Sequence, residues 1–171
     1  MTFVGVAQAA VMVALTGVLA WAAVNDVRVR KIPNAAVLAV LALYLPWAFL
    51  HPPSAALSAL AAGGLALVVC FLMYCFRIVG AGDAKLFSAV AVFGGMKLLP
   101  GLALATVLAG GAIVLVRLAI EPRRALLLWH MRGRLDDGRG VPYGLAIALG
   151  AVAVFWTSRF GVLPKALALT Y

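Results

Sequence analysis

Long apolar stretches separated by short polar connections run along the whole chain. A helix needs about 20 mostly apolar residues to cross the hydrocarbon core of a bilayer. Six stretches approach that length, and each ends at charged residues, proline or glycine. The pattern predicts an all-α bundle of six transmembrane helices, over Phe3–Val24, Ala35–Leu50, Leu57–Phe76, Asp83–Leu99, Leu102–Ile120 and Pro142–Thr157.

The composition agrees with a membrane protein. Of the 171 residues, 66% are hydrophobic and 11% are charged, whereas soluble domains carry about 25% charged residues. No polar stretch is long enough to form a separate soluble module, so we expect a single membrane domain over residues 1–171. The net charge of +9 is not a sign of nucleic-acid binding, because the basic residues lie between the predicted helices.

Those basic residues predict the orientation of the chain. All but three of the 14 lysines and arginines fall on one side of the predicted bundle, in or beside the connections after the first, third and fifth helices. Cytoplasmic connections are rich in Lys and Arg. We therefore expect a multi-pass protein of the cytoplasmic membrane with both termini outside. The other side holds Lys97, Arg159 and Lys165.

Two carboxylates lie at the ends of predicted helices. Asp26 closes the first helix and Asp83 opens the fourth, both on the predicted cytoplasmic side. A charge there is costly unless it is used or paired. Two carboxylates in one low-dielectric site share a proton, so one can deprotonate a water while the other donates to a carbonyl. The pair predicts a dyad that activates a water molecule. An alternative interpretation of Asp83 alone is that it is the N-cap of a helix after a glycine-rich turn.

Glycines flank Asp83 at positions 80 and 82. The missing side chains would let another backbone approach the carboxylate. We expect Gly82 to be the more sensitive position, with Gly80 further from the carboxylate. Metal and cofactor chemistry is not expected, because two carboxylates without a His or Cys cluster make a poor zinc site.

Three motifs, in chain order, resemble the type IV prepilin peptidases, which are membrane aspartic proteases of the Gly-x-Gly-Asp type. The motifs are Asp26 with the following Ile32-Pro33-Asn34, then Gly80-Ala81-Gly82-Asp83-Ala84-Lys85-Leu86, then Val141-Pro142-Tyr143-Gly144. The resemblance implies cleavage of the short basic leader of prepilin-like proteins at the cytoplasmic membrane face. It implies catalytic roles for Asp26 and Asp83. The residues expected to shape the site are Gly80, Gly82, Lys85, Pro33, Asn34, Tyr143 and Gly144.

The chain is similar to the short form of that family found with tight-adherence (Flp-type) pilus systems. It begins directly in an apolar stretch, without the cysteine-containing segment of the longer members. N-methyltransferase activity is therefore not expected. The implied partners are a prepilin or pseudopilin and membrane lipids. Archaeal preflagellin peptidases share the core, so the substrate stays open, as does the oligomeric state.

Other interpretations remain for the same residues. The aspartates could relay protons in a small transporter, or the chain could be a non-catalytic assembly subunit. Lys85 could reach the lipid headgroups, Asn34 could cap the second helix, and Tyr143 could be an interfacial aromatic residue. The basic loop over residues 121–141 is expected to lie on the membrane surface.

Overall fold

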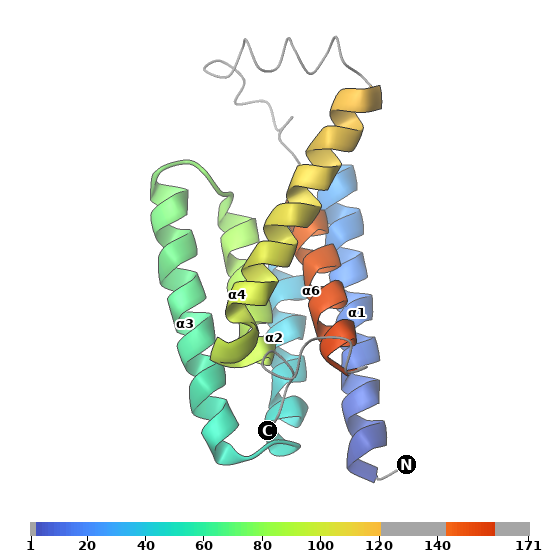
Figure 1. The fold of residues 1–171 in the computed structure, drawn as a ribbon, viewed down its shortest axis with the longest axis vertical. Helices are drawn as coiled ribbons and strands as arrows, with labels where there is room; N and C mark the ends of the chain where they lie inside the picture. The colour runs from blue at the N-terminus through green and yellow to red at the C-terminus, as the bar shows by residue number, and fades with distance from the viewer. Residues whose placement is uncertain (1–2, 121–142, 160–171) are drawn as a thin grey trace.

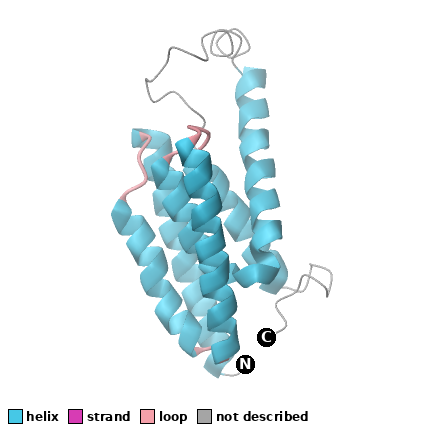
Figure 2. Ribbon diagram, turned by 90° about the vertical axis from the view of Figure 1, so that its left-hand side faces the viewer, coloured by secondary structure: helices cyan, strands magenta, loops and turns pink. Residues whose placement is uncertain are grey.

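The computed structural model describes residues 3–120 and 143–159 as an all-helical bundle, with no strand among them (Figures 1 and 2). The predicted loop at 121–141 and Lys165 lie outside these residues. The helices are α1 (Phe3–Val29), α2 (Asn34–Phe49), α3 (Pro53–Cys75), α4 (Ala81–Ile120) and α6 (Tyr143–Arg159).

Three of these helices, α1, α3 and α4, are long and apolar enough to span a membrane. The apolar helices α2 and α6 are shorter, at 16 and 17 residues. The chain is thus an all-helical membrane protein, as its hydropathy predicts. The number of spans, six, stays a prediction.

Helix α4 reverses direction within its 40 residues (Figure 1). Its first arm runs antiparallel to α3, and its second arm returns toward the end of the bundle where the first arm began. The break lies at Gly95, with φ 58° and ψ −173°, a combination that is essentially restricted to glycine. The break expected at Pro100-Gly101 is therefore wrong. Pro100 lies close to the start of the second arm, where proline is best tolerated.

Helix α3 holds this reversal in place. The Met96 backbone N–H donates to Ser58 Oγ at 3.1 Å. A Cβ atom on Gly95 would lie 3.0 Å from the same oxygen. The start of the second arm is thus capped by a side chain of the neighbouring helix.

The first arm of α4 forms the centre of the core. Nearly every residue from Ala84 to Gly95 is buried. Phe93 is fully enclosed, and its ring lies within 6.4 Å of the rings of Tyr44 and Trp47 from α2 and Phe155 from α6. This arm therefore fixes how α2 and α6 are placed.

Small residues bring helices close together at two points. A Cβ on Gly63 of α3 would lie 2.5 Å from a methyl carbon of Val92 in α4. A Cβ on Gly150 of α6 would lie 2.7 Å from the backbone nitrogen of Thr106. These glycines are needed for helix packing of the kind common between membrane helices.

The expected Asn34 cap is absent, and α3 likewise begins without a side-chain cap. Asn34 is the first residue of α2, whose N-cap is Pro33, and α3 begins at Pro53, whose N-cap is Pro52. Neither helix has a side-chain cap. In both cases a proline with extended backbone already sets the entry angle, and its carbonyl accepts the first N–H bond of the turn.

Candidate active site

Asp26 lies near the end of α1 and is 7% exposed. Its Oδ2 accepts a hydrogen bond from the backbone N–H of Gly144, in the first turn of α6, at 2.8 Å. A Cβ on Gly144 would lie 2.9 Å from that oxygen and 3.0 Å from Asp26 Cγ. Only glycine lets the backbone of α6 approach this carboxylate so closely, and Gly144 was expected at the site from its motif.

Asp83 is the third residue of α4, because the helix begins at Ala81. Its side chain is partly exposed. The carboxylate accepts a hydrogen bond from the backbone of Gly80, and the Ala84 N–H donates to the Gly80 carbonyl at 3.0 Å. An acidic residue at the third helical position that bonds back to the capping residue resembles half of a capping box. The interpretation of Asp83 itself as the N-cap is therefore wrong.

The two carboxylates lie at the same end of the bundle. Asp26 is near the end of α1 and Asp83 is in the first turn of α4 (Figure 1). Ile32, in the loop directly after α1, packs against Gly82, the residue before Asp83. The chain thus brings together two aspartates that are far apart in sequence.

The two glycines beside Asp83 have different surroundings. A Cβ on Gly80 would lie 2.8 Å from Asp83 Oδ2. A Cβ on Gly82 would instead lie 3.3 Å from Ile32 Cβ. The expectation that Gly80 is further from the carboxylate is therefore wrong: Gly80 leaves room at the carboxylate, and Gly82 leaves room for a neighbouring loop.

That loop joins the first two motifs. Helix α1 ends with the Arg30 N–H donating to the Asp26 carbonyl at 3.0 Å, and Arg30 has a φ of 57°. The chain then passes Ile32, which packs against Gly82, and Pro33, which begins α2. The Ile-Pro-Asn segment therefore connects the element carrying Asp26 with the element carrying Asp83.

Three of the expected site residues are exposed. Lys85 is exposed, and it is two residues beyond Asp83, which places it on a different side of α4. Asn34 is exposed at the start of α2. Tyr143 is 41% exposed, and its ring lies 3.6 Å from the position of a Cβ on Gly110.

Of the two cysteines of α3, Cys70 is buried and Cys75 is exposed. Within residues 3–120 and 143–159 no group of His, Cys, Asp or Glu could hold a metal.

The fold and the site define a helical membrane protein with a carboxylate pair at one end of its bundle. A profile of the type IV leader peptidase family matches residues 13–115. This match covers more than half of the chain and includes both aspartates, so the chain belongs to the type IV leader peptidase family. It is accordingly a membrane peptidase. No curated protein and no solved structure matches the chain.

Proposed function

We propose that the protein is an aspartic endopeptidase that removes the short basic leader from type IV (Flp-type) prepilins or pseudopilins at the cytoplasmic membrane face. The observation that carries this proposal is that Asp26, near the end of α1, and Asp83, at the start of α4, lie at the same end of the bundle (Figure 1). The family supplies the reaction class.

In the proposed reaction a water molecule lies between the carboxylates. The ionised aspartate takes a proton from this water as it attacks the scissile carbonyl carbon, and the neutral aspartate donates a proton to the carbonyl oxygen. When the C–N bond breaks, the leaving amine takes up a proton and a carboxylic acid remains. The Gly144 N–H bond to Oδ2 of Asp26 orients one of the two carboxylates for these steps.

The charge distribution supports cleavage on the cytoplasmic side. Among the described residues, the basic side chains at the aspartate end of the bundle are Arg28, Arg30, Lys31, Arg77, Lys85 and Arg117. Lys and Arg mark the cytoplasmic ends of membrane helices. The reversal within α4 supports counting its two arms as separate spans, which would bring the described helices to the six spans of the proposal. Both termini would then lie outside.

A proton-relay function is less well supported. Transporters bind their coupling ions near the bilayer midplane, often at broken helices. Here both carboxylates lie at helix ends, and the break in α4 at Gly95 lies at the opposite end of the bundle.

The test is co-expression of Asp26→Asn or Asp83→Asn with a candidate prepilin, followed by a gel shift for leader removal. Asparagine keeps the shape but cannot exchange the proton, so we expect cleavage to fall by at least about 100-fold. The exposed residue Ser54 lies at the far end of the bundle, and Ser54→Ala is the control that keeps cleavage. Near-normal cleavage by either aspartate variant, with the protein folded, would contradict the dyad.

A further inference from the structure

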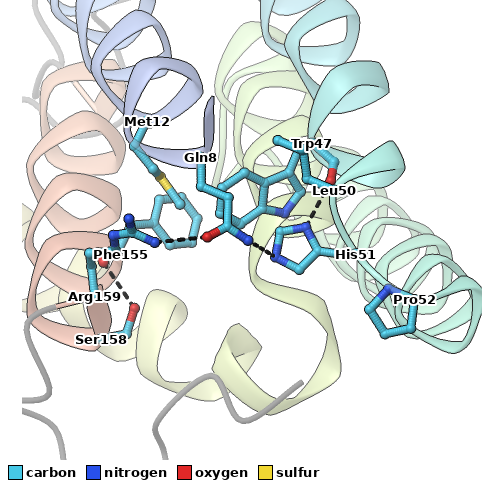
Figure 3. Close-up of a pocket in the computed structure, with 9 residues that line it drawn as sticks. All are labelled: Gln8, Met12, Trp47, Leu50, His51, Pro52, Phe155, Ser158 and Arg159. Carbon is cyan, nitrogen blue, oxygen red and sulfur yellow. Dashed lines mark hydrogen bonds between the residues drawn. The ribbon is translucent and has the colours of Figure 1, made fainter. Parts of the chain in front are cut away.

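A cavity of about 360 Å³ opens at the end of the bundle opposite the aspartates (Figure 3). It lies between the beginning of α1 and the ends of α2 and α6. The lining combines polar and apolar side chains, of Gln8, Met12, Trp47, Leu50, His51, Pro52, Phe155, Ser158 and Arg159. Its volume is within the range of small-ligand sites.

A chain of hydrogen bonds links four residues that line this cavity (Figure 3). Arg159 donates to Gln8 Oε1 at 2.9 Å, and the Gln8 amide nitrogen lies 3.3 Å from His51 Nε2. His51 Nδ1 lies 2.7 Å from the Trp47 carbonyl oxygen. Because a carbonyl can only accept, Nδ1 carries the hydrogen, and Nε2 then accepts from Gln8. His51 is therefore neutral in this arrangement.

The cavity has a positive charge from Arg159. Among the lining residues that the structure describes, Arg159 is the single formally charged side chain and none is a carboxylate. A guanidinium has five N–H groups, and two of them bond to Gln8 and to the Gly5 carbonyl. The others can bind an oxyanion, for which the planar guanidinium is well suited.

The depth of the cavity points to the membrane surface. Gln8 and Asp26 are 18 residues apart on the same helix α1, which at a rise of 1.5 Å per residue is about 27 Å. The hydrocarbon core is about 30 Å thick. If the aspartates lie at one interface, the cavity lies at the headgroups of the other, where tryptophan is enriched.

We propose that this cavity binds a phosphate oxyanion, supplied by the headgroup of an anionic phospholipid. The phosphate lies against Arg159 and Gln8, and the apolar part of the lipid lies against Trp47, Met12 and Phe155. Bound lipid would tie α1, α2 and α6 together at the end remote from the peptidase site. This assignment does not depend on the proposed cleavage.

The test measures the melting temperature of the full chain in neutral detergent with three added probes: short-chain phosphatidylglycerol, short-chain phosphatidylcholine and inorganic phosphate. We expect phosphatidylglycerol to raise the melting temperature saturably, with half-saturation at least about tenfold lower than for phosphatidylcholine. In Arg159→Gln this difference disappears. In Lys97→Gln, which removes the other described cation at this end, it stays.

A saturable rise with inorganic phosphate in wild type, lost in Arg159→Gln, would support the oxyanion site but identify the source as free phosphate. Equal shifts by both lipids in wild type would overturn the proposal. So would an undiminished phosphatidylglycerol shift in Arg159→Gln.

Arg159 also links α6 to α1, so its loss could weaken the fold itself. Gln8→Glu separates the two roles. At about pH 8.5, where free histidine is neutral, it strengthens the link to Arg159, removes the N–H donor to His51 Nε2 and places a negative charge in the cavity. We expect the protein to stay folded without lipid, with the α6–α1 link kept, and the phosphatidylglycerol shift to fall at least about threefold. A full shift in Gln8→Glu would contradict the site.

Discussion

At the residue scale, the site depends on two glycines, because a side chain at either position would crowd an aspartate. Gly144 lets the α6 backbone donate to Asp26, and Gly80 leaves the space beside Asp83 Oδ2 empty. Each glycine stands next to one aspartate. The carboxylate pair therefore has two separate steric requirements, which can be tested one at a time.

Gly144→Ala should displace the Asp26 carboxylate. The new methyl would lie about 3.0 Å from three Asp26 atoms, closer than carbon and oxygen normally pack. We expect leader cleavage to fall at least about tenfold, with a loss of stability of about 1–3 kcal/mol. Gly17→Ala is the control: its Cβ meets nothing within 4 Å. If Gly144→Ala cleaves like the parent, the Gly144 contact is not required.

Gly80→Ala should mainly lower cleavage, whereas Gly82→Ala should mainly lower the melting temperature. The methyl at position 80 crowds Asp83 Oδ2, so we expect lower cleavage with little change in melting temperature. The methyl at position 82 presses on Ile32, so we expect mainly a lower melting temperature. Both variants are measured for prepilin cleavage and for thermal unfolding. A Gly82→Ala protein that melts normally but no longer cleaves would favour direct contact of Gly82 with substrate instead.

The two aspartates and Gly144 could be named from the sequence, but the directions in which neighbouring side chains point could not. Each residue turns a helix by about 100°, so a start at Ala81 rather than Asp83 changes which side chains face the site. This explains why Gly82, and not Gly80, was expected to be the glycine nearer to the Asp83 carboxylate.

At the element scale, the reversal in α4 decides the architecture. One glycine, Gly95, allows the first arm to be buried in the core and the second to return along the bundle. Hydropathy alone could not place this break, because the apolar run continues through it. Pro100 was the strongest breaker in the sequence, but its position near a helix start makes it compatible with the second arm.

Gly95→Ala should destabilise the fold. An L-residue at φ 58° and ψ −173° is strained by about 1–3 kcal/mol, and the methyl would also lie 3.0 Å from Ser58 Oγ. Thermal unfolding in detergent measures the effect. Gly101→Ala is the matched control in the same helix, with nothing within 4 Å of its Cβ. Equal melting temperatures for the two variants would show that Gly95 does not control the turn.

At the scale of the whole molecule, the two ends of the bundle carry different chemistry. The aspartates and most of the described basic residues lie at one end, and the cavity with Arg159 lies at the other. The uneven distribution of basic residues could be predicted from the sequence, because it depends on which connections carry them and not on side-chain packing; the orientation in the membrane stays a prediction. The cavity was beyond prediction, since it needs the ends of three helices to be placed together.

The orientation can be tested with two cysteine positions. Cys75 is exposed at the aspartate end of α3, and Ser54 is exposed at its other end. A membrane-impermeant maleimide should label Cys75 in inverted vesicles and not in intact spheroplasts. In Cys75→Ser combined with Ser54→Cys, the pattern should reverse. Cys75→Ser alone is the control: it leaves the buried Cys70, which should react only after unfolding. Labelling of Cys75 from outside would place the aspartates on the wrong face for cytoplasmic leader cleavage.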